Sequence, residues 1–254
     1  MRRILLAGAL VLAVAPIAGA QTLAPAVQSA PLPLAGRTIV IDPGHNGGNS
    51  SHHEITSRQV WIGTNWKDCD ADGASTDDGY NESQHNWDVA VVLRQLLQQE
   101  GARVILTRTS NAGVGPCITR RAEIGNINRA DAAVSIHADG NLNGGDHGFH
   151  VILPEDVGQT PWMLRRSIAL GTAIRDALRA EGPTAVSNYI GQNGLIVRGD
   201  LGGLNMSRVP KVFTEIGNMH SPLDAPQIES PSGRRAEAAA IAAGITRFLT
   251  GRRA

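Results

Sequence analysis

The sequence lacks an excess of charge of either sign. Its 254 residues include 23 Lys and Arg and 23 Asp and Glu, which gives a formal net charge of zero. A balanced chain offers no case for nucleic acid or an anionic surface as the main partner, because binding to either needs an excess of cations. The sequence also lacks internal repeats, and its length is ample for one sizeable core. We therefore expect a single domain and no nucleic-acid partner.

A long hydrophobic run occurs only at the N-terminus. Arg2 and Arg3 precede an apolar segment, residues 4–18, which is too short to span a membrane comfortably, and a site of small residues ends at Ala20. This order of basic, apolar and small residues is typical of a secretory signal. We expect residues 1–20 to be a signal peptide that exports the protein to the periplasm, cell wall or exterior, without membrane contact after cleavage. An uncleaved membrane anchor is the alternative.

Cysteine occurs only twice, as Cys69 and Cys117. Neither residue lies in a Cys-x-x-Cys motif, which argues against zinc bound through thiolates. In an oxidising compartment an even number of cysteines favours a disulfide, and we expect one between these two residues. Two free thiols are the alternative.

The rest of the sequence alternates between strand-like and helix-like segments. Residues 21–35, rich in Ala and Pro, are expected to be a flexible leader, and residues 36–250 are expected to be the domain. Apolar β-branched runs predict strands, and amphipathic stripes predict helices. The predicted strands are 39–41, 103–107, 132–136, 149–153, 195–198 and 212–214, and the predicted helices are 82–100, 119–129, 161–181 and 234–249. Such alternation predicts an α/β fold with a mostly parallel sheet and helices on both of its faces.

His45 stands close behind the first predicted strand. Residues 39–41 are a short β-branched run, and the Asp-Pro-Gly sequence at 42–44 ends it abruptly. A polar side chain at the carboxyl end of a central strand lies where open α/β sheets bind their ligands. His45 is therefore a candidate ligand, with a plain turn histidine as the alternative.

Three further polar residues occupy matching positions. His137 and Glu215 each follow a predicted strand, and Glu82 begins a helix after a long polar segment. Because the carboxyl ends of parallel strands share one edge of the sheet, we expect these side chains and His45 to converge. Two histidines and one carboxylate commonly bind catalytic zinc and leave a fourth position for water. A second carboxylate nearby would move protons, so the set predicts hydrolysis of an amide or ester.

Simpler roles for these residues stay open. A glutamate at a strand end can form a salt bridge, and a histidine at the start of a loop can be an ordinary hydrogen-bonded residue. The sequence has no HExxH motif. The histidines that compete with His45 and His137 as candidate ligands are His52, His53, His147 and His150.

Asp68, Asp70 and Asp72, followed by Gly73, have the spacing that opens a calcium-binding loop. The closing glutamate of such a loop would fall at position 79, which is a glycine. We therefore expect a solvated turn here rather than a calcium site.

Four sequence blocks together resemble one enzyme family. They are Ile-Asp-Pro-Gly-His ending at His45, Glu82 before an amphipathic helix, Ser-Ile-His-Ala-Asp around His137, and Thr-Glu-Ile-Gly-Asn around Glu215. In order and spacing the sequence resembles the zinc-dependent N-acetylmuramoyl-L-alanine amidases of the Amidase_3 type over residues 36–250. The resemblance is greatest to small mycobacterial-type members with a lone catalytic domain and a disulfide.

This resemblance implies a role for each of the four residues. His45, Glu82 and His137 would bind one Zn²⁺ per chain, and Glu215 would be the catalytic acid and base. The substrate would be peptidoglycan or muropeptides, cut at the amide bond between N-acetylmuramic acid and L-alanine by an autolysin that we expect to be monomeric. The alternatives are a non-catalytic wall-binding or regulatory relative of the same fold, and another zinc hydrolase such as a carboxypeptidase or deacetylase.

The sequence departs from the family pattern in three places. Residues 46–81 form a longer connection than usual, which we expect to be a rim or lid of the groove. Residues 138–147 are too few for the inhibitory helix of some members, so we expect an open site. Wall-binding repeats are absent, so binding must come from the groove itself. Its polar candidates, for which a plain solvated role is favoured, are Asn188, Arg198, Asn205 and Arg208.

Overall fold

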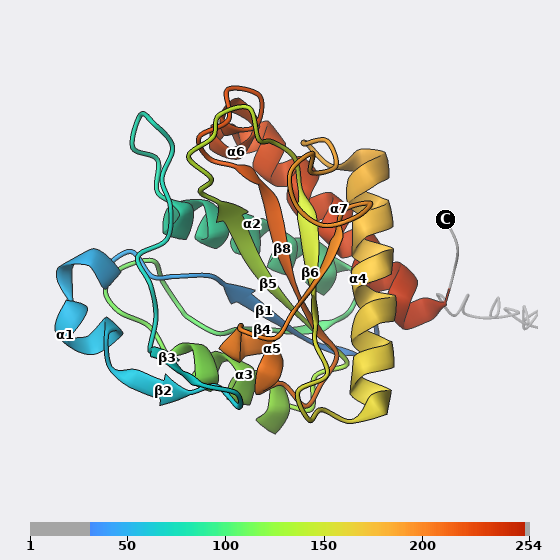
Figure 1. Cartoon of the computed structure of the whole chain (residues 1–254). Helices are drawn as coiled ribbons and strands as arrows, with labels where there is room; N and C mark the ends of the chain where they lie inside the picture. Colours follow the sequence, from blue (N-terminus) through green and yellow to red (C-terminus); the bar gives the residue numbers. More distant parts are fainter. Residues whose placement is uncertain (1–30, 252–254) are drawn as a thin grey trace, which may run out of the picture. The chain divides into compact units, whose positions relative to one another are not determined.

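Six strands form the central sheet of the computed structural model, which describes residues 31–251 (Figure 1). Their order across the sheet is β4-β1-β5-β8-β6-β7. Neighbours among β4, β1, β5 and β8 are parallel, whereas β6 is antiparallel to β8 and parallel to β7. The strands are β1 (Thr38–Pro43), β4 (Arg103–Leu106), β5 (Ala132–Asp139), β6 (His150–Pro154), β7 (Leu195–Arg198) and β8 (Lys211–Asn218). The expected mostly parallel sheet is confirmed.

Helices cover both faces of this sheet, as the alternating sequence predicted. The long helices α2, α4 and α7 pack together and against one face, and α3 and the short α5 contact the other. They are α2 (Glu82–Gln99), α3 (Ile118–Ile127), α4 (Pro161–Glu181), α5 (Gly202–Asn205) and α7 (Pro231–Thr250), with α6 (Ala225–Glu229) packed on α7. Among residues 31–251, no helix is long and apolar enough to cross a membrane.

The alternation of side chains along each strand makes the two faces chemically different. Ile39 and Ile41 of β1 belong to the main apolar core with α2, α4 and α7. Val40, between them, belongs to a small cluster on the α3 side. Because side chains two residues apart share a face, Asp42 also lies on the α3 side. The face that α3 and α5 contact, which we call the thinly covered face, therefore carries polar side chains of the strands such as Asp42.

The packed part of the chain begins slightly before Gly36, the residue at which the change in composition placed the start of the domain. The expected signal peptide, residues 1–20, and most of the expected leader, residues 21–35, lie outside the described residues. Leu34 is fully buried, and its amide donates a hydrogen bond of 2.8 Å to the carbonyl oxygen of Glu100. The packed chain thus includes residues just before Gly36, where the sequence placed the start of the domain.

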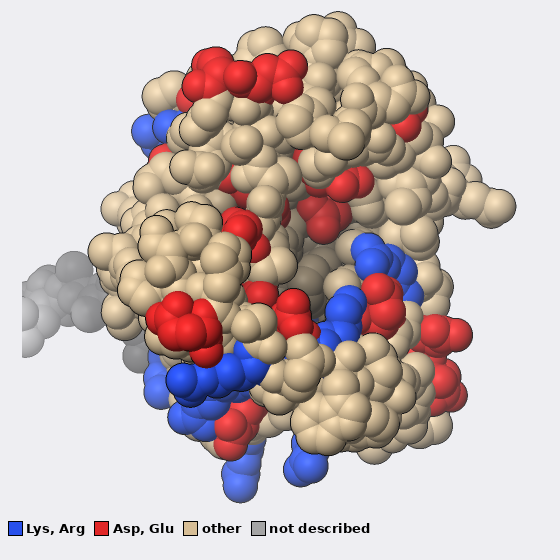
Figure 2. Space-filling model, turned by 60° about the vertical axis from the view of Figure 1, so that its left-hand side comes forward, with Lys and Arg blue, Asp and Glu red and all other residues tan. Residues whose placement is uncertain are grey.

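The surface near the carboxyl ends of the parallel strands is hollowed. Two cavities of about 490 and 560 Å³ lie there, and His45 and His137 line both of them. Figure 2 shows a hollow on this side of the molecule, with acidic and basic side chains around it. The polar strand-end residues therefore open onto a groove.

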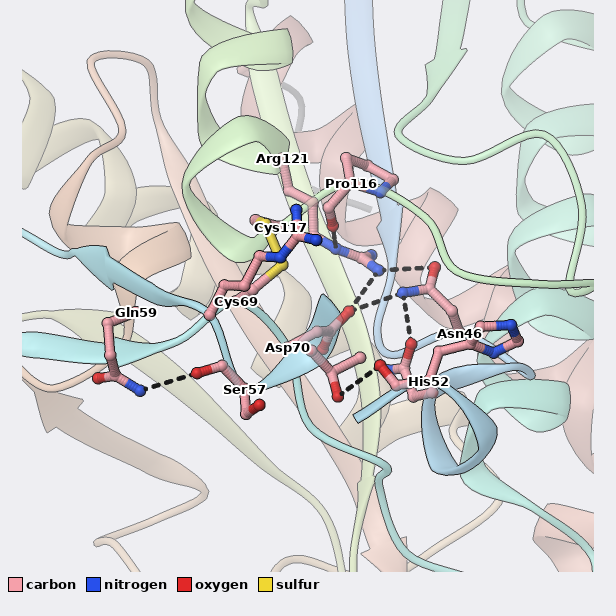
Figure 3. Close-up of a disulfide and its surroundings, with 12 residues drawn as sticks. Asn46, His52, Ser57, Gln59, Cys69, Asp70, Pro116, Cys117 and Arg121 are labelled. Atoms are coloured by element: carbon pink, nitrogen blue, oxygen red, sulfur yellow. Dashed lines mark hydrogen bonds and ion pairs between the residues drawn. A yellow bond between two sulfur atoms is a disulfide. The ribbon is translucent and has the colours of Figure 1, made fainter. Parts of the chain in front are cut away.

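The long polar segment, residues 46–81, carries local structure that the sequence did not reveal. It contains η1 (Asn49–Ser51), α1 (His53–Thr56) and a hairpin of two short antiparallel strands, β2 (Gln59–Trp61) and β3 (Trp66–Asp68). The expected disulfide is present, and it joins Cys69, directly after β3, to Cys117, directly before α3 (Figure 3). The segment is therefore tied to the body of the domain.

Asp42 is the centre of a buried network of charges on the thinly covered face. Its carboxylate accepts hydrogen bonds from Arg121 and Lys211, each at 2.9 Å, and from Thr107 and Ser135, each at 2.7 Å. Burial alone would raise the pKa of Asp42, but Lys211 and Arg121 hold that pKa well below its ordinary value. The carboxylate is therefore ionised and paired, as a buried charge must be.

Arg121 extends this network to the turn after β1. Its guanidinium donates to the carbonyl oxygens of Pro43 and His45, at 2.7 and 3.0 Å. It also donates to the carboxylate of Asp70 at 3.0 Å (Figure 3). Asp68, Asp72 and Gly73 are exposed, as a solvated turn requires, but Asp70 is only 7% exposed and its charge is neutralised inside the protein by Arg121. The expectation of a solvated turn is therefore wrong for Asp70 alone. The guanidinium thereby fixes the turn that carries His45.

Replacing both cysteines, as Cys69→Ser with Cys117→Ser, tests the contribution of the disulfide. The bond spans 48 residues, and in the chain-entropy model closing a loop of this size stabilises by about 4 kcal/mol. We expect the free energy of unfolding, measured by urea denaturation, to fall by about this amount. An unchanged denaturation midpoint would contradict the prediction.

Replacing Arg121 by Met tests the buried network. Removing one partner of a buried ion pair leaves the carboxylates of Asp42 and Asp70 short of a cation, so we expect a loss of about 3–5 kcal/mol in the free energy of unfolding. Arg120→Met is the matched control, because the Arg120 side chain is 52% exposed and pairs only with exposed Glu123. The control variant should lose less than about 1 kcal/mol. Equal losses in the two variants would refute the role given to Arg121.

Candidate metal centre

His45 is held in a backbone conformation that few residues other than glycine adopt. Its φ is 56°, in the left-handed region, directly after Gly44. A Cβ atom at Gly44 would lie 2.1 Å from Cε1 of His137, so only glycine lets the imidazole of His137 lie against this turn. Backbone strain of this kind persists where surrounding contacts determine it, and here the contacts of Arg121 do so. The turn brings the two predicted histidines together.

The structure joins His45, Glu82 and His137 in one cluster, as the sequence predicted. Nε2 of His45 lies 3.2 Å from one carboxylate oxygen of Glu82, and Nδ1 of His137 lies 2.9 Å from the other. One ligand atom from each residue lies within 4.8 Å of the others. Within residues 31–251, no other group of three His, Cys, Asp or Glu side chains offers ligand atoms this close together. The competing histidines, His52, His53, His147 and His150, are outside the cluster.

Backbone groups orient the members of this cluster. Nδ1 of His45 donates to the carbonyl oxygen of Ala71 at 2.8 Å in the tautomer that leaves Nε2 facing Glu82. The amides of Ala74 and Ala138 donate to the two oxygens of Glu82, at 2.8 and 3.2 Å. A histidine that binds a metal usually donates its other ring N–H to such a carbonyl or carboxylate. The cluster therefore has the supporting contacts of a metal site.

The charges of the cluster suit metal binding as well. Burial opposes ionisation of Glu82, but His45 and His137 hold the pKa of that carboxyl well below its ordinary value. Burial lowers the pKa of His137, which favours the neutral imidazole. The pKa of His45 is raised despite its burial, because Glu82 and Asp70 lie beside it, so a metal bound here would take the place of a proton next to these carboxylates. An ionised carboxylate between two imidazoles is a common ligand set for a divalent transition metal.

Glu215 lies next to the cluster, on the neighbouring strand. It pairs in register with His137 of β5, so both side chains point to the thinly covered face. The side chain is half-buried, and burial together with the carboxylates of Glu82 and Asp139 raises the pKa of Glu215 well above its ordinary value. A raised pKa makes the carboxylate of Glu215 a stronger base, which suits a group that accepts and passes on protons.

His150 extends the same row of side chains by one strand. It pairs in register with Glu215 from β6 and is 2% exposed. Burial lowers the pKa of His150 to about 4, so the ring is neutral, and its Nδ1 has no hydrogen-bond partner among the described residues. The sequence offered His150 only as a competing metal ligand, and its position beside Glu215 depends on the antiparallel pairing of β6, which was not expected.

The other polar candidates for the groove make contacts inside the protein. The Asn188 side chain binds the backbone of His147 and Gly145. Arg198 forms a bidentate ion pair with Asp200, in which Nε and Nη2 donate to the two carboxylate oxygens at 2.9 and 2.8 Å. Arg208 lines a separate cavity of about 1000 Å³, which includes none of the residues of the metal cluster. Asn205 donates to the carbonyl oxygen of Gly199 at 2.7 Å and lines the same separate cavity.

Comparisons with known proteins also point to amide hydrolysis. Residues 39–247 match the family model Amidase_3, described as N-acetylmuramoyl-L-alanine amidase. The N-acetylmuramoyl-L-alanine amidase Rv3717 of Mycobacterium tuberculosis is 38% identical over 238 residues, which cover 92% of this chain and 95% of that protein.

Two solved structures of mycobacterial amidases share the fold of this chain. Ami1 from Mycobacterium smegmatis superposes with a TM-score of 0.81 at 38% identity, covering 86% of this chain and 99% of Ami1. Ami1 from Mycobacterium abscessus gives 0.80 at 40% identity, covering 85% and 100%. The family model alone covers most of the chain. The chain therefore belongs to the Amidase_3 family of N-acetylmuramoyl-L-alanine amidases, which are hydrolases of the bacterial cell wall.

Proposed function

We propose that the chain uses one Zn²⁺, held by His45, Glu82 and His137, to hydrolyse the amide bond between N-acetylmuramic acid and L-alanine. The observation that carries this proposal is the close approach of three ligand atoms, within 4.8 Å, from three separate elements. Two imidazoles and one carboxylate fit zinc in a catalytic site, where a fourth position stays open. The groove on both sides of the cluster gives room for a substrate with a saccharide and a peptide portion.

The bound metal would polarise the lactyl carbonyl and lower the pKa of an attacking water. Glu215 then moves the protons: its carboxylate accepts one from the water and delivers it to the leaving nitrogen of L-alanine. Water adds to the carbonyl carbon, the C–N bond breaks, and the products are a lactyl carboxylate and a free amine. The raised pKa of Glu215 suits this transfer, because it makes the carboxylate a stronger base toward the proton of the water.

Two features support the enzyme over a non-catalytic wall-binding relative. The three proposed ligand residues and the proposed acid–base carboxyl group are all present, and Glu215 lies in register beside His137 of the cluster. We also propose that the protein acts outside the cytoplasm as a monomer. The disulfide supports that location, because such bonds persist in oxidising compartments.

The variant Glu215→Gln tests the proton transfer. It keeps the shape of the side chain but cannot move a proton, so we expect kcat to fall about 100- to 10,000-fold while one zinc per chain stays bound. Free peptide stems released from muropeptides, measured by mass spectrometry, give the rate. Glu123→Gln, at an exposed position on α3, is the matched control and should keep the normal rate. A normal rate in Glu215→Gln would show that another group moves the proton.

The variants His45→Ala and His137→Ala test the metal site. Loss of one imidazole leaves two ligands, so we expect both zinc content, measured by mass spectrometry of the purified protein, and amidase activity to be lost. His53→Ala is the control, because its side chain is 67% exposed and outside the cluster. A chelator should abolish the activity of the wild-type protein and added Zn²⁺ should restore it. Full activity of the chelated protein would rule out metal catalysis.

A further inference from the structure

Two of the four tryptophans of the chain lie together on the β2–β3 hairpin. Trp61 and Trp66 are cross-strand partners, with ring centroids 5.7 Å apart and planes inclined by 62°. Their side chains stay open to solvent, at 47% and 62% exposure. A cross-strand aromatic pair stabilises a hairpin by at most about 1 kcal/mol, which does not require such exposure. Adjacent exposed aromatic rings more often mark a surface that binds a partner.

One cavity links Trp66 to the cluster of His45, Glu82 and His137. Trp66 lines the same cavity of about 490 Å³ as His45 and His137. The apolar side chains of Leu201 and Phe213 line this cavity as well, and the Phe213 ring stacks on His137 at 5.1 Å with an interplanar angle of 10°. Trp66, with Trp61 packed against it, therefore borders the proposed catalytic groove.

Two contacts hold strand β3 of the hairpin in place. Nζ of Lys67 donates to the carbonyl oxygen of Asp200 at 2.9 Å and lies 3.5 Å from its carboxylate. The disulfide fixes Cys69, directly after β3, to the start of α3. An aromatic surface that is already in position loses little conformational entropy when a ligand binds. The two indole rings thus form a platform whose position is fixed before a ligand binds.

The charges around the platform indicate a neutral partner. Lys67 is paired with Asp200, and Arg198 is paired with the same carboxylate. Asp68 is a further acidic group beside Trp66. Lys67 and Arg198 are thus both neutralised by Asp200, so these two cations do not favour an anionic polymer. The flat apolar faces of pyranose rings suit the negatively charged faces of the indoles, because the ring C–H groups carry a small positive charge.

We propose that Trp61 and Trp66 form a saccharide-binding platform that holds the glycan portion of the substrate beside the metal cluster. This inference rests on the proposed function. The scissile amide joins a saccharide to a peptide, and the two cavities share His45 and His137, so each portion has a side of its own. The glycan lies toward the hairpin, and the stem peptide lies in the other cavity with Asp139, Glu215 and His220.

Direct binding of a saccharide that the enzyme does not cut tests the platform without relying on catalysis. The probe is the tetrasaccharide of N-acetylglucosamine, titrated by calorimetry into the full protein. We expect Trp66→Ala to raise Kd about tenfold and Trp61→Ala to raise it several-fold. Trp162→Ala is the matched control, because Trp162 is 54% exposed but lines the separate cavity on α4. Equal Kd values in all variants would overturn the platform.

Substrates with and without sugars separate binding from folding. On muropeptides that carry a tetrasaccharide, Trp66→Ala should raise KM about tenfold with kcat unchanged, and on a lactyl-peptide without sugar both constants should stay normal. Trp66→Phe keeps an aromatic face and should recover most of the affinity, whereas Trp66→Leu should not. Lost rates on the sugar-free substrate, together with a lowered Tm, would mean that the pair serves only the hairpin fold.

The two proposals fail in different ways. If the tetrasaccharide binds through Trp66 but no substrate is cleaved by the wild-type protein, the proposed function fails and the platform stands. If muropeptides are cleaved while the tryptophan variants bind and turn over glycan substrates normally, the platform fails and the proposed function stands.

Discussion

A single buried guanidinium connects the parts of this protein that its chemistry needs. Arg121 pairs with Asp42 in the sheet and with Asp70 in the long polar segment, and it binds the carbonyl oxygens of the turn that carries His45. A planar group with five donors can satisfy more acceptors, and in a more fixed geometry, than the three donors of a lysine. The left-handed conformation of His45 is thus imposed by contacts from three segments of the chain, and the metal cluster inherits its geometry from them.

The unequal covering of the two sheet faces explains why the site lies where it does. On one face three long helices bury a continuous apolar core that gives the sheet its rigidity. On the other, α3, α5 and the hairpin leave room for His137, Glu215 and His150, which stand in one row across β5, β8 and β6. A firm apolar layer therefore supports a row of polar side chains, and that row opens to the groove.

Much of this arrangement could be predicted from the sequence, and the exceptions have physical causes. His45, His137 and Glu215 were singled out because strand ends in a parallel sheet share an edge, and Glu82, at the start of a helix, joined them through the resemblance of the four sequence blocks to one family. The role of Arg121 was not predicted, because no local sequence pattern marks a buried arginine whose partners lie 51 and 79 residues away. The hairpin in residues 46–81 has strands of three residues, too short for a clear alternating pattern.

The antiparallel direction of β6 could have been deduced, since the connection after Asp139 is too short for the crossover that a parallel strand needs.

The position of the disulfide has a consequence for when the enzyme matures. Asp70 and Ala71, whose oxygens flank His45, follow Cys69 directly in the sequence. Oxidation of the two thiols therefore also fixes the atoms that orient His45. Assembly of the His45, Glu82 and His137 cluster is in this way coupled to oxidising conditions, because a reduced chain carries His45 on a looser frame.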